Sequence, residues 1–182
     1  MSKAKIKFTY EDYRNLPESE TKRYELLEGD IVMVPSAATY HQRISVRLQY
    51  ILEGLVQQHS LGSIYSAPCD VVLSEENVVQ PDIFFVSKAR SQIIKEECIE
   101  GAPDLVIEIL SPATSGRDRT YKRTLYARHG VQEYWLVDPK EQAVEVLTLS
   151  QAQFKPTRIY RKADVLKSAL LSNLEINLSE IF

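Results

Sequence analysis

The segment from Asp104 to Leu110 constrains the fold of this chain more than any other segment. It reads Asp-Leu-Val-Ile-Glu-Ile-Leu, so its apolar residues follow one another instead of alternating with polar ones. A strand of this kind is buried on both faces, inside a sheet that other elements cover. One acid, Glu108, interrupts the apolar run. Because an ionised carboxylate loses several kcal/mol of solvation at such a position, it requires a charged partner or a bound cation.

Local patterns predict the elements that precede this strand. Thr9 is a helix cap that predicts a short helix ending near Leu16-Pro17, and residues 24–34 predict a β-hairpin that turns at Glu28-Gly29-Asp30. Apolar residues spaced three and four apart predict an amphipathic helix from His41 to Gln58. The apolar face of this helix is expected to cover a sheet.

The middle of the chain is rich in Val, Ile, Phe and Tyr. Residues 63–73 and 78–86 flank the polar turn 74–77, so they predict an antiparallel pair of strands with Asp82 inside the second strand. Residues 87–103 are expected to form a loop.

A second helix is predicted after the buried strand. It runs from Arg117 to His129 and ends at Gly130, a residue suited to a C-terminal cap. Asp118, Lys122 and Tyr126 are four residues apart and therefore share one face. Two further patterns follow this helix: residues 133–149 predict a hairpin, and residues 154–160 predict one more strand.

Length and composition predict a single domain over residues 1–182. A hydrophobic fraction of 44% is enough for a core in a chain of 182 residues. The apolar runs are far shorter than the roughly 20 residues of a membrane span, and no apolar signal core follows the N-terminus, so we expect a cytoplasmic protein with no membrane partner. Cys69 and Cys98 lie in no C-x-x-C pattern, which predicts reduced, buried thiols and neither a disulfide nor a zinc site.

The net charge of −3 argues against a broad nucleic-acid-binding surface. Positive charge is concentrated in one segment instead. Its cations are Arg117, Arg119, Lys122, Arg123 and Arg128. Arg117, Arg119 and Arg123 are our candidates for nucleic-acid binding, and the competing interpretation is that the segment is one solvated helix face.

Asp82 and Glu108 suggest a metal site. Each carboxylate adjoins an apolar strand, and the two would converge at one end of a sheet if the strands were neighbours. Oxygen ligands of this kind favour Mg²⁺ or Mn²⁺, and Lys122 could polarise a phosphate beside such an ion. In the competing interpretation Asp82 caps a strand end and Glu108 pairs with Arg117 or Arg119.

Several motifs together resemble a known family. They are Val79-Gln80-Pro81-Asp82, residues 101–112, Arg117-Asp118-Arg119 with Lys122 and Tyr126, and weaker matches at residues 24–29, His41 and residues 133–139. This set, which covers nearly the whole chain, resembles the Uma-two-type family, once called domain of unknown function 820, of the PD-(D/E)XK restriction-endonuclease-like superfamily. The resemblance implies an α/β (α+β) fold with a central mixed β-sheet flanked by helices and additional β-hairpins. It also implies a metal site built from Asp82 and Glu108.

One position departs from the superfamily pattern. Leu110 stands where a lysine is expected two residues after the second acid, and the family pattern places that lysine on the next helix, where Lys122 fits. The candidate catalytic residues are therefore Asp82, Glu108 and Lys122.

Three further residues are candidate accessory groups. Glu25, which matches the family motif better than Glu28, could be a third carboxylate, or else an acid on the surface of a hairpin. His41 could carry a proton or neighbour the metal, although a histidine at a helix start more often forms a cap. Tyr126 could orient a phosphate or simply pack in the core.

Three functions remain open from the sequence. The first is a Mg²⁺- or Mn²⁺-dependent endonuclease, with DNA as the expected substrate and RNA as an alternative. The second is a catalytically silent member of the same fold that binds nucleic acid or protein, and the third is a metal-dependent hydrolase of small phosphates. The apolar pairs Phe84-Phe85 and Tyr134-Trp135 suggest that the protein forms a homodimer, which would suit cleavage of both strands of a duplex.

Overall fold

The computed structural model describes residues 6–17 and 22–182, and its framework is a six-stranded mixed sheet. In spatial order the strands are β11 (Gln153–Arg161), β10 (Ala143–Ser150), β9 (Glu133–Asp138), β8 (Leu105–Ile109), β6 (Ile83–Ser87) and β3 (Gly62–Ser66). β8 and β9 run parallel, and the other neighbouring pairs in this sheet are antiparallel. The predicted hairpin at residues 133–149 and the strand that follows it are confirmed.

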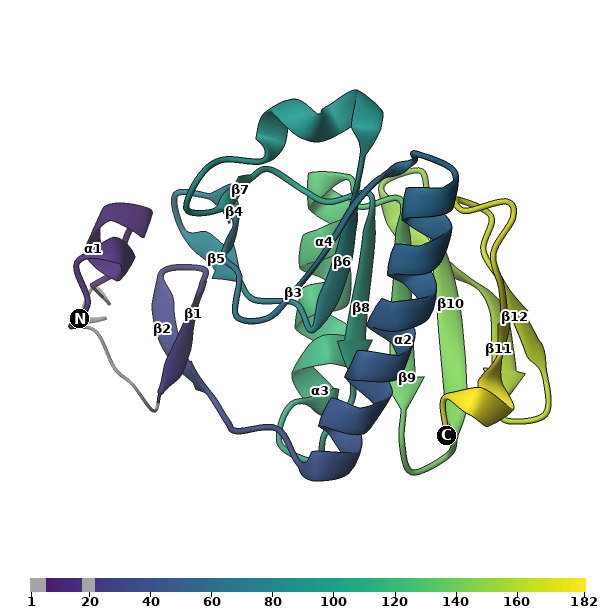
Figure 1. Cartoon of the computed structure of the whole chain (residues 1–182). Helices are drawn as coiled ribbons and strands as arrows, with labels where there is room; N and C mark the ends of the chain where they lie inside the picture. The colour runs from purple at the N-terminus through teal and green to yellow at the C-terminus, as the bar shows by residue number, and fades with distance from the viewer. Residues whose placement is uncertain (1–5, 18–21) are drawn as a thin grey trace.

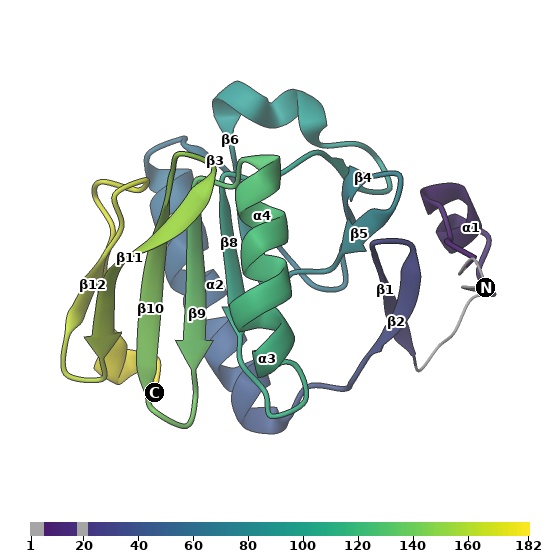
Figure 2. The same ribbon diagram turned by 180° about the vertical axis from the view of Figure 1, so that it is seen from behind.

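Helices cover both faces of this sheet, as Figures 1 and 2 show from opposite sides. The long helix α2 (Thr39–Gln58) lies on one face. A nearly continuous helical segment lies on the other face and consists of α3 (Ser115–Arg117), the π-helical turn η2 (Asp118–Lys122) and α4 (Arg123–His129). Gly130 ends this segment with a φ of 86°, as the sequence predicted. The predicted fold class, a central mixed sheet flanked by helices, is confirmed.

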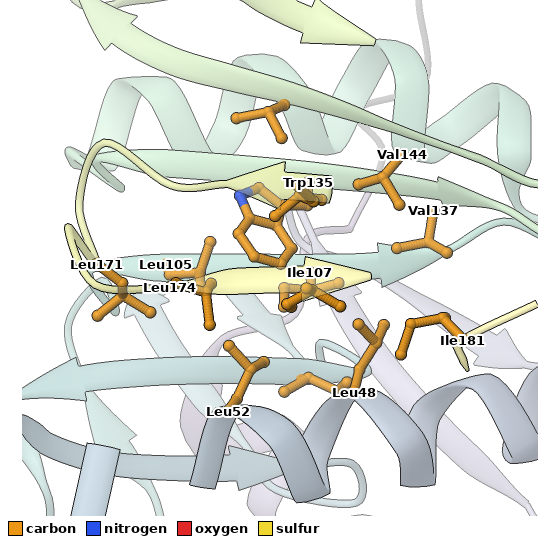
Figure 3. Close-up of a cluster of buried hydrophobic side chains, with 14 of the residues drawn as sticks. Leu48, Leu52, Leu105, Ile107, Trp135, Val137, Val144, Leu171, Leu174 and Ile181 are labelled. Atoms are coloured by element: carbon orange, nitrogen blue, oxygen red, sulfur yellow. The ribbon is translucent and has the colours of Figure 1, made fainter. Parts of the chain in front are cut away.

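Alternation along β8 divides the core into two clusters. Leu105 and Ile107 point toward α2 and pack with Leu48 and Leu52 (Figure 3). Val106 belongs to the second cluster, which also contains Tyr126 of α4. All five residues of β8 are buried, which confirms the prediction of a strand covered on both faces. Glu108 shares the face of Val106 because successive side chains of a strand point to opposite sides.

A smaller sheet packs beside the first. Its strands, in spatial order, are β2 (Asp30–Val34), β1 (Arg23–Leu27), β5 (Asn77–Val79), β4 (Val71–Ser74) and β7 (Ile99–Glu100). β1 and β2 form the predicted hairpin. The short helix α1 (Tyr10–Arg14) begins after the predicted cap, Thr9, and lies on the far side of this hairpin (Figure 1).

The C-terminal segment completes the first core cluster. It contains β12 (Val165–Lys167), β13 (Glu175–Asn177) and the 3-10 turn η3 (Leu178–Glu180). Ile176 and Ile181 are buried in the cluster that α2 also covers.

The predicted long antiparallel pair in the middle of the chain is wrong in part. Residues 62–66 and 83–87 pair in the larger sheet, whereas residues 71–74 and 77–79 pair in the smaller one, so each predicted strand is divided between two sheets. Pro68 and Pro81 lie at the breaks, where a residue without a backbone N–H cannot continue a ladder.

Two details of the predicted elements change with this division. Asp82 does not lie inside a strand but directly precedes β6. The predicted loop at residues 87–103 contains the 3-10 helix η1 (Lys88–Ile93) and the strand β7.

Other sequence expectations concern exposure. Phe84, Phe85, Tyr134 and Trp135 are all buried inside the protein, so they cannot supply the self-association surface that suggested a homodimer. Cys98 is buried and Cys69 half-buried, and both are free thiols. Within the described residues, no helix is long and apolar enough to span a membrane.

Candidate active site

The register between β6 and β8 brings Asp82 and Glu108 together. Ile83 is paired with Ile107 in this antiparallel ladder, so the next position along each strand places Asp82 beside Glu108. The Asp82 carboxylate is fixed there because its Oδ2 accepts a hydrogen bond of 2.7 Å from the backbone N–H of Ile109. The predicted convergence of the two acids at one end of the sheet is therefore observed.

Lys122 reaches the same place from the π-helical turn. Its Nζ donates to Glu108 Oε1 at 3.0 Å and to Glu25 Oε1 at 2.8 Å, and it lies 3.8 Å from Asp118 Oδ1. Lys122 is only 5% exposed, so these contacts are shielded from water. The alternative that Glu108 pairs with Arg117 or Arg119 is wrong, because its cationic partner is Lys122.

The three candidate accessory residues also surround these groups. Glu25 lies on β1 but is only 2% exposed, so it is not an acid on the hairpin surface. Tyr126 is fully buried and donates its hydroxyl hydrogen to Glu108 Oε1 at 2.7 Å. His41, in the first turn of α2, places Nε2 3.1 Å from Asp82 Oδ2.

Negative charge exceeds positive charge in this cluster. The ammonium group of Lys122 is surrounded by four carboxyl groups, those of Asp82, Glu25, Glu108 and Asp118. Burial raises the pKa of Glu108 to about 8; Lys122 opposes this rise, and the other three acids add to it. For Lys122 burial alone would lower the pKa, but Glu108, Glu25 and Asp118 outweigh burial and raise it above the ordinary lysine value. Lys122 is therefore protonated at neutral pH.

A small cavity of about 50 Å³ lies among these residues. It is lined by Glu25, His41, Gln80, Asp82, Glu108, Asp118 and Lys122, among others. Within the described part of the chain, the buried side-chain polar atoms that lack a hydrogen-bond partner are His41 Nδ1, Gln80 Oε1 and Asp118 Oδ1, all on residues that line this cavity. Because unpaired buried polar atoms are costly, this clustering points to a site that holds water or an ion.

The donor set suits a hard, hydrated cation. The hydrogen bonds described above use Oδ2 of Asp82 and Oε1 of Glu108, which leaves the other oxygen of each carboxylate for a metal. Among the described residues, no three acidic, histidine or cysteine side chains are arranged as a complete metal-binding group. Mg²⁺ usually keeps several waters and needs only one or two carboxylates from the protein. Two carboxylate oxygens and an excess of negative charge fit that requirement.

The arginines nominated from the sequence differ in position. Arg117 lines the cavity. Arg119 instead binds Asp138 at 3.0 Å and Glu145 at 3.2 Å, and Arg123 donates to the carbonyl oxygen of Phe154 at 2.9 Å. These two guanidinium groups are thus held by other elements and do not line the acidic cavity.

Sequence reasoning missed several residues that line the cavity. Among them are Arg23, Gln80 and Asp118. Asp118 had a visible signal, since it shares a helix face with Lys122, and Gln80 stands within the Val79-Gln80-Pro81-Asp82 motif. Arg23 had none, because the sequence does not say which end of the hairpin approaches the second acid.

A larger groove lies elsewhere on the described part of the chain. It measures about 1210 Å³ and runs along the C-terminal half of α2 beside β3. None of the residues nominated from the sequence lines it. The smaller acidic cavity, where the reactive groups converge, is therefore the candidate active site.

A comparison with known families identifies the family of the chain. The family model of Uma2, described as "Putative restriction endonuclease", matches residues 10–179. The chain belongs to the Uma2 family. The match includes every residue of the acidic cavity named above.

Relatives of this Uma2 protein occur among curated and solved proteins. The uncharacterized protein sll1609 of Synechocystis is 23% identical over 131 residues, which cover 71% of this chain and 74% of the relative. The uncharacterized protein slr1290 of Synechocystis is 26% identical over 140 residues, which cover 72% of this chain and 68% of the relative. The crystal structure of a putative nuclease of the DUF820 group from Anabaena variabilis superposes with a TM-score of 0.80 at 24% identity and covers 96% of this chain and 97% of that one. The two proteins share the same fold.

Proposed function

We propose that this Uma2 protein is a divalent-metal-dependent endonuclease that hydrolyses phosphodiester bonds in DNA. The observation that carries the proposal is the convergence of Asp82, Glu108 and Lys122 on one cavity from three separate elements. Two carboxylates and an ammonium group satisfy the two needs of phosphodiester hydrolysis, which are a metal-binding pair and positive charge for the phosphate. The membership of the chain in a family of nuclease-like proteins supports the same chemistry.

Asp82 and Glu108 would hold the cation, Mg²⁺ or Mn²⁺. When bound there, such an ion supplies charge stabilisation to the phosphate and lowers the pKa of a coordinated water. Lys122 contributes a fixed positive charge beside the same carboxylates, which offsets the negative charge that develops on the phosphate during hydrolysis.

Three other side chains are positioning residues in this proposal. Tyr126 orients Glu108 through its 2.7 Å hydrogen bond, and Glu25 holds Lys122 at 2.8 Å. His41 contacts the Asp82 oxygen that also accepts from the Ile109 amide, so it restricts the rotation of that carboxylate.

A second candidate function is hydrolysis of small phosphate compounds. The small volume of the cavity, about 50 Å³, and the net charge of −3 favour it over a polymer substrate. The two candidates differ in the length of substrate that they accept, so one set of assays separates them.

The test is a cleavage assay on plasmid, linear and single-stranded DNA and on RNA, with Mg²⁺, Mn²⁺ or EDTA. We compare the wild type with Asp82→Asn, Glu108→Gln and Lys122→Met, and we use Glu141→Gln and Lys155→Met as exposed controls of the same chemistry. We expect metal-dependent cleavage that all three site variants lose and both controls keep. Hydrolysis of bis-p-nitrophenyl phosphate or mononucleotides without cleavage of any polymer would favour the second candidate. If folded wild type hydrolyses none of these substrates and binds no metal in titration, both candidates are wrong.

A further inference from the structure

We infer that Arg23 and Arg117 form a two-arginine clamp that binds the phosphate backbone of a nucleic-acid strand at the acidic cavity. This inference rests on the proposed function and specifies how the substrate is held. It replaces two of the arginines nominated from the sequence, Arg119 and Arg123, with a residue from the N-terminal hairpin.

Strand geometry places Arg23 at the cavity. Arg23 and Glu25 are two residues apart on β1, and such residues project from the same face of a strand. The Glu25 carboxylate binds Lys122 inside the cavity, so Arg23 projects toward the same space and forms part of its lining. Its charge acts on the neighbouring His41 side chain, which also lines the cavity.

Arg117 approaches from another element. It is the last residue of α3 and directly precedes the π-helical turn that carries Asp118 and Lys122. Like Arg23, it lines the cavity and is half-buried. The hairpin and the helix therefore each contribute one guanidinium group to the same small space.

Both guanidinium groups are available to a ligand. Within the described residues, neither Arg23 nor Arg117 makes a hydrogen bond or ion pair to another side chain or to the backbone. By contrast, Arg90 is bound to Asp104, and Arg119 is bound to Asp138. Because these two half-buried guanidinium groups bind no other group among residues 6–17 and 22–182, their donors remain for a ligand, and they fit the role of ligand contacts.

The charge of the site explains why such contacts are needed. With a divalent cation bound, the ion and Lys122 supply three positive charges against four carboxyl groups, so the site holds no excess positive charge for a phosphodiester. The two arginines add two positive charges at the cavity, so the site attracts a phosphate although the whole chain carries a charge of −3.

The chemistry of the groups also indicates the kind of recognition. A guanidinium group presents paired N–H donors that match two oxygens of a phosphate. Contacts to the backbone position a strand but do not read its bases. We therefore expect the clamp to bind strands of different sequence with similar affinity.

The test measures binding separately from cleavage. Fluorescence anisotropy reports the affinity of wild type for labelled single-stranded and duplex oligonucleotides in Ca²⁺, over a range of salt concentrations, with the oligonucleotide checked for integrity on a gel. The variants are Arg23→Gln, Arg117→Gln and the double variant, and the matched control is Arg128→Gln, an exposed arginine near the end of α4. Arg23→Lys and Arg117→Lys keep the charge but lose the paired donors, and circular dichroism verifies folding.

We expect each clamp variant to weaken binding about tenfold and to reduce the slope of log affinity against log salt by about one. The lysine variants should bind with intermediate affinity, and Arg128→Gln should bind like the wild type. Unchanged affinity in both glutamine variants overturns the clamp, and so does an equal loss in Arg128→Gln or the absence of binding by wild type.

The outcome for the clamp can be told from the outcome for the proposed function. If wild type cleaves DNA with metal while Arg23→Gln and Arg117→Gln bind normally, the endonuclease stands and the clamp is wrong. If wild type binds through these arginines but hydrolyses nothing in the cleavage assay, the clamp stands and the endonuclease is wrong.

Discussion

Replacement of Lys122 with methionine is the most direct test of the electrostatic balance at the site. Methionine retains much of the length of lysine but removes the ammonium group. Its loss deprives Glu25 and Glu108 of a partner at 2.8 and 3.0 Å, and Asp118 of one at 3.8 Å. All three acids are buried, at 2%, 4% and 1% exposure, so water cannot replace the lost partner without a change in structure.

The expected magnitude follows from this burial. Removing one partner of a buried ion pair costs about 3 to 5 kcal/mol of folding free energy, because the remaining charge is left uncompensated. Glu108 relieves part of this cost by taking up a proton, since burial already raises its pKa to about 8 in the wild type. We therefore expect a loss of about 3 kcal/mol at pH 8, which for a chain of this size lowers the melting temperature by roughly 10 °C.

The loss of folding free energy in Lys122→Met should increase with pH. Burial raises the folded-state pKa values of Glu108 and Asp118 above their unfolded values, and removal of Lys122 takes away the charge that opposes this rise. Such groups destabilise the protein increasingly as pH rises through and above the unfolded value. The destabilisation by Lys122→Met should therefore be smaller at pH 5 than at pH 8.

Urea unfolding followed by circular dichroism at pH 5, 6.5 and 8 measures this free energy. Lys167→Met is the matched control, because Lys167 lies 2.7 Å from Glu175 but both side chains are more than half exposed, at 64% and 63%. We expect little change for this control. A loss for Lys122→Met no larger than that for Lys167→Met, or one that does not vary with pH, would refute the reasoning that Lys122 compensates buried acids.

Other predictions concern the metal, the core and the domain. Mg²⁺ or Mn²⁺ should raise the melting temperature of wild type but not of the double variant Asp82→Asn/Glu108→Gln, and EDTA should reverse the rise; an equal rise in both proteins would place the metal elsewhere. Tyr126→Phe removes the donor to Glu108 and should slow cleavage about tenfold in a folded protein; unchanged cleavage would show that this hydrogen bond does not position the acid. Glu133→Ala should lower the free energy of unfolding by about 3 kcal/mol, because the buried Glu133 carboxylate accepts hydrogen bonds from Trp135, from the Ser168 hydroxyl and from the backbone amides of Ala169 and Leu170. Thermal unfolding tests this, and a variant as stable as the wild type would contradict it. Residues 1–182 should unfold in one transition by fluorescence and by circular dichroism, and two separate transitions would mean more than one domain.

Much of the fold could be predicted because it depends on local patterns. The alternation and apolar runs that define β1, β2, α2, β8, β9 and β10 are properties of short segments, and the predicted elements match the observed ones there. The middle strands were predicted incorrectly because two proline signals, Pro68 and Pro81, were outweighed by the surrounding β-branched residues. The consequence was large, since each break transfers the chain from one sheet to the other.

Some residues of the candidate site could likewise be predicted from local patterns, whereas the contacts of others could not. Asp82 and Glu108 stood out because carboxylates beside apolar strands are unfavourable without compensation, and Lys122 shared a helix face with Asp118. The interactions of Arg119 and Arg123 with other elements could not be anticipated. Charge clustering in a sequence shows where cations occur but not which acids or carbonyl groups lie within reach after folding.

The sequence by itself determined which acidic residues need a charged partner or a bound cation, and which face of each helix or strand they occupy. A buried acid in an apolar strand and a fixed side-chain period are local facts, and they follow from solvation and backbone geometry. Only the tertiary structure decided that Glu25 and Arg23, far away on a hairpin of the smaller sheet, join Asp82, Glu108 and Lys122 at one cavity. The physical reason is that packing of one sheet against another depends on the fit of whole surfaces. No short segment of the chain carries that information.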